Sequence, residues 1–224
     1  MTTNIKVISR CIYSWLNYLQ SVSKSKLLLE SSVRFPLAEC IERQFGKEVS
    51  LECDYPKDGL FEGHKLDFCF LSNDVTNNIE LKFLNDNTDA KNERIRYLSD
   101  LIRLASLSGE HTSNYFILAG SITDYEFHFH NEPATITNKK IPDGVSQRTP
   151  KRKVFAKWFP EVYGSVAEVS LSDFKAEYNE SFKKIYRKDL PDWVISVELV
   201  AKESNENYPE VVFIWKVSKK VIDI

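Results

Sequence analysis

Two acidic residues and a lysine, Asp67, Glu80 and Lys82, lie within the segment His64–Leu84. Two apolar-rich runs in this segment flank Ser72–Asn77, whose Ser, Asn, Asp and Thr residues suit a turn, so the segment predicts a β-hairpin. Side chains directly opposite each other in a hairpin lie about 5 Å apart, and diagonal ones about 7–8 Å apart. We therefore expect Asp67 to face Glu80 or Lys82, at a separation that lets carboxylate oxygens hold a hard cation such as Mg²⁺ or Mn²⁺.

Alternation along the predicted strands separates charged from apolar side chains. Asp67 and Cys69 are expected on one face of the first strand, and Glu80 and Lys82 on one face of the second. The apolar residues expected on the opposite faces are Leu66, Phe68, Phe70, Ile79, Leu81 and Phe83. The charged cluster also has a simpler explanation, because antiparallel sheets often place a cross-strand ion pair on an exposed face. The hairpin alone leaves both explanations open.

A helical stretch, Leu27–Gly46, precedes the hairpin and supplies a third carboxylate. On an ideal helix one stripe holds Leu27, Glu30, Arg34, Leu37, Ile41 and Phe45. Glu30 therefore lies on the inward-facing side, with Glu42 at the edge of the stripe and Glu39 on its far side. A carboxylate that only stabilises a helix N-terminus is the alternative for Glu30. Pro36 must start a new helix or kink a continuous one.

The segments around the hairpin complete an ordered set of elements. Val49–Cys53 alternates and predicts a first strand, and the polar stretch Asp54–Gly63 predicts a loop beside the site. Apolar spacing then predicts a helix at Ala90–Ser108, and the apolar run Asn114–Ala119 predicts a buried strand. Charged residues of that helix that could join the site are Arg94, Arg96, Asp100 and Arg103, although most of them are expected on a solvated face.

The spacing of the charged residues resembles the signature of the PD-(D/E)XK nuclease superfamily. Asp67 matches its first acidic residue, Glu80 and Lys82 match the (D/E)XK part, and Leu66 stands where the superfamily name has proline. Members usually carry a helical glutamate upstream of the hairpin, and Glu30 stands in that position. The order helix, strand, hairpin, helix, strand is that of the superfamily core. The run YLSDLIRLASLSGEHTSNYFILAGS also looks like part of nuclease domains from microbial defence and restriction systems.

This resemblance implies an α/β fold, with a PD-(D/E)XK-like central mixed sheet flanked by helices. It also implies a Mg²⁺- or Mn²⁺-dependent (endo)nuclease that hydrolyses phosphodiester bonds, with DNA as the expected substrate, in microbial restriction or anti-phage defence. Asp67, Glu80 and Glu30 would hold the metal, and Lys82 would orient the attacking water. A catalytically silent nuclease-like binding or scaffold module is the alternative. A homodimer or a partner in a defence complex is compatible with either function.

A basic segment follows the expected core. It contains Lys139, Lys140, Lys151, Arg152 and Lys153 in and after a polar loop, and it runs into Phe155, Trp158 and Phe159. Basic residues next to aromatic ones suit phosphate contacts and base stacking, so these lysines and the arginine are candidate nucleic-acid contacts. A flexible solubilising loop is the alternative.

Two histidines precede this segment. His128 and His130 alternate with Phe127 and Phe129, which predicts a strand carrying an HxH pair on one face. Such a pair can bind a transition metal, but it has no evident third ligand. Two ordinary surface histidines are the alternative.

The whole chain of 224 residues is expected to form a single nuclease-like domain. Its core spans about residues 26–130, an amphipathic helix covers residues 4–22, and a C-terminal α+β extension begins near residue 150. In the extension, the patterns predict a strand at 166–171, a helix at 173–187 and a hairpin of strands at 193–201 and 211–217. This hairpin would extend the sheet or form a small subdomain.

The composition indicates which partners and which cellular location to expect. A net charge of −2 gives no overall sign of nucleic-acid binding, although a local basic patch is compatible with it. No apolar run reaches the roughly 20 residues that cross a bilayer, so we expect no membrane association. Cys11, Cys40, Cys53 and Cys69 show no metal-binding spacing. We expect buried free thiols and a cytoplasmic location.

Overall fold

The computed structural model describes residues 2–24, 27–57, 59–84, 90–129 and 157–220. The strands are β1 (Ser50–Asp54), β2 (Lys65–Ser72), β3 (Val75–Phe83), β4 (Thr112–Ser121), β5 (Val166–Ser170), β6 (Val194–Asn205) and β7 (Tyr208–Lys220). The helices are α1 (Thr2–Ser21), α2 (Glu30–Phe45), α3 (Ala90–Ser106), α4 (Ile122–Phe129), the 3₁₀ helix η2 (Leu171–Phe174) and α6 (Lys175–Tyr186).

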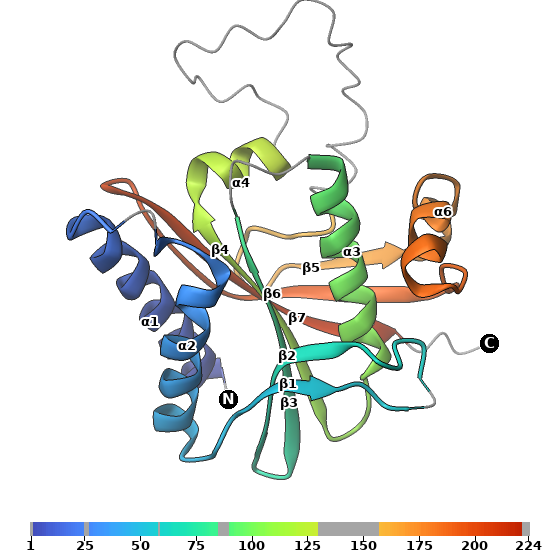
Figure 1. Ribbon diagram of the computed structural model, residues 1–224, viewed down its shortest axis with the longest axis horizontal. Coiled ribbons are helices and arrows are strands. Elements are labelled where there is room, and N and C mark those ends of the chain that lie inside the picture. The colour runs from blue at the N-terminus through green and yellow to red at the C-terminus, as the bar shows by residue number, and fades with distance from the viewer. Residues whose placement is uncertain (1, 25–26, 58, 85–89, 130–156, 221–224) are drawn as a thin grey trace, which may run out of the picture.

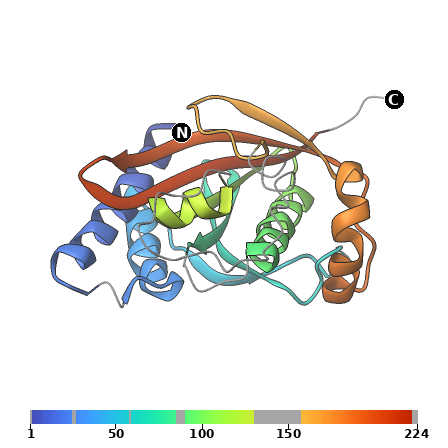
Figure 2. The same ribbon diagram turned by 90° about the horizontal axis from the view of Figure 1, so that it is seen from above.

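All seven strands form one mixed sheet, in the order β1-β2-β3-β4-β7-β6-β5. Helices α1 and α2 lie on one side of the sheet, and α3, α4 and α6 lie on the other (Figure 1). The expected mixed α/β fold, with a mixed sheet flanked by helices, is therefore confirmed. The C-terminal hairpin extends the same sheet because β7 pairs with β4. Figure 2 shows β6 and β7 side by side, reaching from α1 to α6.

The hairpin that carries the acidic residues has a shorter turn than the sequence predicts. The turn residues are Asn73 and Asp74, which both adopt the left-handed conformation with φ of 50° and 59°. Two-residue hairpin turns require this conformation, and Asn and Asp tolerate it better than other side chains. The pairing therefore begins at Ser72 and Val75, and the predicted turn Ser72–Asn77 is too long.

Pro36 lies inside α2, which runs without interruption from Glu30 to Phe45. In an α-helix the carbonyl of Ser32 accepts the N–H of the residue four positions later, and proline has no N–H. Trp15 of α1 supplies the missing donor, because its Nε1 donates to the Ser32 carbonyl at 3.1 Å. A contact between helices thus compensates for the proline.

Each face of the sheet has its own hydrophobic core. The α1–α2 side packs residues such as Leu16, Leu37 and Ile41 against Phe68, Ile79 and Leu81. The other side packs residues such as Leu101, Tyr125 and Phe182 against Phe116, Phe213 and Trp215. The inner stripe predicted for α2 is correct for Leu37 and Ile41, whereas Leu27 precedes the helix and is exposed.

Two local predictions are corrected by this packing. The segment with Phe127 and His128 is the helix α4 rather than a strand, and His128 is buried beside Tyr97. His130 lies outside the described residues, so the prediction of an HxH metal pair stays untested. Trp158 and Phe159 are buried in the core and cannot stack on nucleic-acid bases. The reason is packing in the core, where Phe129 of α4 contacts Tyr97 and Phe159.

The cysteines differ from the expectation of four free thiols. Cys53 of β1 and Cys69 of β2 form a disulfide, with Cα atoms 6.3 Å apart, while Cys11 and Cys40 are free. The two bonded cysteines come together because β1 and β2 are antiparallel neighbours. None of the described helices combines the length and the apolar character that crossing a membrane requires.

Candidate active site

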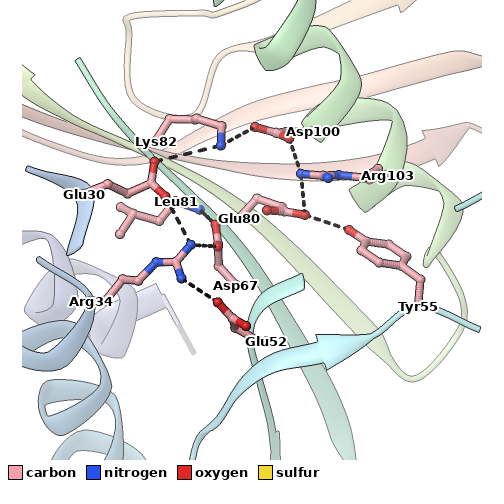
Figure 3. Close-up of polar contacts among 10 residues, drawn as sticks. All are labelled: Glu30, Arg34, Glu52, Tyr55, Asp67, Glu80, Leu81, Lys82, Asp100 and Arg103. Carbon is pink, nitrogen blue, oxygen red and sulfur yellow. Dashed lines mark hydrogen bonds and ion pairs between the residues drawn. The ribbon is translucent and has the colours of Figure 1, made fainter. Parts of the chain in front are cut away.

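The candidate site lies where β2 separates from β3. The pairing of these two strands reaches Phe68 and Ile79 and goes no further toward the start of β2. One residue before Phe68, the Asp67 carboxylate accepts the backbone N–H of Leu81 at 2.8 Å. Side chains from α2 and α3 meet at this opening (Figure 3).

A distortion in β1 accompanies this opening. β1 pairs with β2 at Leu51–Phe68 and at Cys53–Leu66, so Glu52 lies opposite Asp67. Glu52 has a φ of 52°, a left-handed conformation that is costly for a residue with a Cβ atom. The regular alternation of β2 fails at the same place, because Leu66 joins one hydrophobic core while Phe68 joins the other. The expectation that Leu66 shares a face with Phe68 is therefore wrong.

Arg34 links three carboxylates on the α2 side of the site. One terminal nitrogen of its guanidinium contacts Glu30 Oε1 at 3.1 Å and also pairs with Asp67 Oδ1. The other terminal nitrogen lies 3.1 Å from Glu52 Oε1. Glu30 is in the first turn of α2, and Arg34 follows it one turn later, a spacing that brings the two side chains together.

Glu80 and its partners form the deeper half of the site. The Glu80 side chain is 1% exposed, and its Oε1 lies 3.0 Å from the Arg103 guanidinium. Tyr55 donates its hydroxyl to the same oxygen at 2.9 Å. Arg103 also pairs with Asp100, which is 3% exposed and lies three residues earlier on α3. Buried charges of this kind need such partners, because desolvation of an unpaired charge is costly.

Lys82 connects the two halves. Its Nζ lies 3.3 Å from Asp100 Oδ2 and 3.9 Å from Glu30 Oε2. Lys82 and Glu80 are two residues apart on β3 and therefore share a face of that strand. The predicted residues Glu30, Asp67, Glu80 and Lys82 thus belong to one network, which is connected through Arg34 of α2 and through Asp100 and Arg103 of α3 (Figure 3).

Burial and neighbouring charge set the protonation of the network. Burial raises the pKa of the Glu80 carboxyl well above its usual value; Asp100 and Asp67 add to this rise, and Arg103 opposes it. Burial also raises the pKa of Glu30, against the effect of Lys82. Burial alone would lower the pKa of Lys82, but Asp100 and Glu30 raise it above its usual value. Lys82 therefore keeps its positive charge, whereas Glu80 accepts a proton more readily than an exposed glutamate.

The donor set suits a hard divalent cation. Four carboxylates (Glu30, Asp67, Glu80 and Asp100) face three cationic groups (Arg34, Lys82 and Arg103), so the inner network carries an excess of negative charge. Asp100 Oδ2 is buried, and its contact with Lys82 Nζ at 3.3 Å is an ion pair without hydrogen-bond geometry. Oxygen ligands and excess negative charge fit Mg²⁺ or Mn²⁺.

The side chains as they stand are held by arginines instead of being arranged around an ion. Within the described ranges, no three acidic, histidine or cysteine side chains converge closely enough to coordinate a metal. A metal would therefore require at least one of the arginines to move away from its carboxylate.

The other predicted site residues separate into two groups. Glu39 pairs with Arg43, and Glu42 accepts the N–H of Val49 at 3.1 Å, so neither contacts the network described above. The candidate nucleic-acid contacts Lys139, Lys140, Lys151, Arg152 and Lys153 lie outside the described residues.

Sequence reasoning missed the roles of Arg34, Tyr55 and Glu52, and it did not single out Asp100 and Arg103. For Arg34 a signal was present, because it lies on the inward stripe four residues after Glu30. For Asp100 the signal was the apolar character of almost all its neighbours on α3, which are buried around the helix from Tyr97 to Ile102. The expectation of a solvated face is wrong for Asp100.

Comparison with family models, with curated proteins and with solved structures gives no significant match to this chain. The argument for function therefore depends on the geometry of the site.

Proposed function

We propose that this protein is a metal-dependent nuclease of the PD-(D/E)XK type that hydrolyses phosphodiester bonds in nucleic acid, with DNA as the expected substrate. The observation that carries the proposal is the convergence of Glu30, Asp67, Glu80 and Lys82 from three separate elements at one opening in the sheet. An exposed strand face with a simple ion pair does not explain this, because Glu80 is 1% and Asp67 10% exposed.

The arrangement of the elements supports the same proposal. The chain passes from α2 through the antiparallel strands β1, β2 and β3 to α3 and then to β4, which is parallel to β3. This is the order of elements that the sequence resemblance to the superfamily implies. A role in microbial restriction or anti-phage defence follows from the resemblance alone and is part of the proposal.

In this function Asp67, Glu80 and Glu30 would hold Mg²⁺ or Mn²⁺, which would supply Lewis-acid polarisation of the scissile phosphate and a water of lowered pKa. Lys82 orients the attacking water and offsets the negative charge that develops on the phosphoryl oxygens. Asp100 and Glu30 support this role, since they raise the pKa of Lys82 and keep its ammonium charged. The basic residues between Lys139 and Lys153 would contact phosphates along the strand.

A catalytically silent binding or scaffold module is the second candidate function. One observation favours it: Asp67 and Glu80 are already paired with Arg34 and Arg103, so each of these two carboxylates has a cationic partner without a metal. Networks of buried charges can be retained for the fold alone.

Incubation with supercoiled, linear and single-stranded DNA and with RNA, with and without Mg²⁺ or Mn²⁺, tests the two functions. In the enzyme, Lys82→Ala should lower the cleavage rate by about 10²–10³-fold, because one preorganised charge is lost from the transition state. The circular dichroism spectrum and divalent-ion binding should be retained, because Lys82 is not among the proposed metal ligands and Arg103 still pairs with Asp100 when the Lys82 ammonium is removed.

Lys65→Ala is the matched control, because Lys65 lies on the neighbouring strand β2 and forms an exposed ion pair with Asp54. It should leave cleavage unchanged. If the wild-type protein cleaves no nucleic acid and binds no divalent ion at this site, the nuclease function is excluded and the silent binding or scaffold module remains.

A further inference from the structure

The guanidinium of Arg34 lies between two of the carboxylates that the proposed function assigns to the metal. One terminal nitrogen forms ion pairs with both Glu30 and Asp67, and the second terminal nitrogen forms an ion pair with Glu52. In Figure 3 Arg34 lies among these three side chains, with Lys82 beyond Glu30. Arg34 is therefore a single positive charge shared by Glu30, Asp67 and Glu52, and Lys82 is a second cation near Glu30.

The two arginines of the site, Arg34 and Arg103, differ in how deeply their side chains are buried. The Arg103 side chain is 13% exposed and pairs with Glu80 and Asp100, which are almost fully buried. The Arg34 side chain is 27% exposed, and its partner Glu52 is 63% exposed. Removing Arg103 would leave two almost fully buried carboxylates without this partner. Moving Arg34 toward solvent would leave one largely buried carboxylate, Asp67, which still accepts the N–H of Leu81, so the cost is smaller. Arg34 is thus the arginine that can move.

The backbone of β1 is distorted at the residue that holds Arg34 in place. Glu52 lies opposite Asp67 and has a left-handed φ of 52°. Strained backbone of this kind persists where the surroundings require it, and it is concentrated at ligand clamps and switches. The third contact of Arg34 therefore comes from a strained residue next to the site.

We propose that Arg34 is a built-in competitor of the divalent ion, which must displace its guanidinium from Glu30 and Asp67 in order to bind. This inference rests on the metal site of the proposed function and adds a regulatory step to it. The physical reason is that a guanidinium and a divalent cation require the same carboxylate oxygens and repel each other at that distance. The metal affinity is consequently reduced by the free energy of the Arg34 contacts, as for any ligand that must first open its site.

Calorimetric titration of the full chain with Mn²⁺, after removal of metals with a chelator, tests the proposal. Arg34→Gln removes the charge and keeps a shorter polar side chain. We expect it to bind Mn²⁺ roughly tenfold more tightly than the wild type, a factor set by the loss of partly exposed charge-assisted contacts.

The matched control is Arg43→Gln, because Arg43 also lies on α2 and pairs with a glutamate four residues away, at an exposed position. Its Mn²⁺ affinity should equal that of the wild type. If Arg34→Gln does not fold, Arg34→Lys serves instead, because lysine keeps the charge but lacks the fork that reaches three carboxylates. It should bind Mn²⁺ severalfold more tightly than the wild type.

Unchanged or weaker Mn²⁺ binding in the folded Arg34 variant would overturn the proposal. The result is separable from the test of nuclease activity. Tighter Mn²⁺ binding without cleavage of any substrate would support the competition and refute the nuclease. Cleavage by the wild type, combined with an unchanged Mn²⁺ affinity in Arg34→Gln, would support the nuclease and refute the competition.

Discussion

Arg103 is the cation on which the buried half of the site depends. Its guanidinium pairs with Glu80 and with Asp100, whose side chains are 1% and 3% exposed. Arg103→Met keeps an unbranched apolar stem and removes the charge. The substitution leaves two carboxylates in a region with little water, and Lys82 and the Tyr55 hydroxyl remain as their partners.

The expected loss of stability in Arg103→Met follows from the burial of Glu80 and Asp100. Removing one partner of a buried ion pair typically lowers the free energy of unfolding by about 3–5 kcal/mol, compared with a few tenths for an exposed pair on a helix. Because Lys82 and Tyr55 remain, we expect a loss near the lower end, about 3 kcal/mol. Arg43→Met is the control, since Arg43 and Glu39 form an exposed pair whose loss should cost about 0.5 kcal/mol.

The loss should also depend on pH. Burial raises the pKa of Glu80, and Arg103 opposes that rise, so Arg103→Met raises the folded-state pKa further. A carboxyl whose pKa is raised by folding has no effect on the free energy of unfolding below the unfolded pKa of about 4.3, where it is protonated in both states. Above that value it lowers the free energy of unfolding, and the loss grows as the pH rises through the folded-state pKa. The deficit of Arg103→Met should therefore be smallest near pH 4.5 and largest near pH 8.

Urea denaturation in the presence of EDTA, at several pH values, measures this effect. In a Glu80→Gln background the Arg103→Met substitution should cost at least about 1 kcal/mol less, because the two side chains interact directly. A deficit below about 1 kcal/mol at pH 8, or one that does not change with pH, would refute the account of Arg103 as the counter-ion of Glu80.

Two further predictions concern the scaffold. Trp15→Phe should lower the free energy of unfolding by about 1–2 kcal/mol, because it leaves the Ser32 carbonyl without the donor that replaces the missing N–H of Pro36. The loss should be smaller in a Pro36→Ala background, and equal losses in both backgrounds would contradict the compensation. Alkylation of the denatured, unreduced protein followed by mass spectrometry should label Cys11 and Cys40 only, because Cys53 and Cys69 are bonded. Reduction should cost about 3 kcal/mol of stability, and labelling of all four cysteines before reduction would contradict the disulfide.

Local periodicity determined much of this molecule. The alternation in His64–Leu84 is sufficient to predict the hairpin and to place Glu80 and Lys82 on one strand face, because side chains along a regular strand such as β3 alternate. The amphipathic spacing of α1 and α3 was predictable for the same local reason. Glu30 was identified as an inward-facing carboxylate from the stripe of α2 alone. These features depend only on residues a few positions apart.

The tertiary structure decided how these elements meet. The separation of β2 from β3 at Asp67, the left-handed Glu52 and the disulfide between Cys53 and Cys69 all depend on the pairing of strands. The ion pairs of Arg34 and Arg103 depend on how close α2 and α3 come to the sheet. The free energy of a buried charge is set by its neighbours in space, and segments far apart in the sequence supply those neighbours. For that reason the sequence alone could nominate Asp67, Glu80 and Lys82, whereas only the folded chain determined that each is held by an opposite charge.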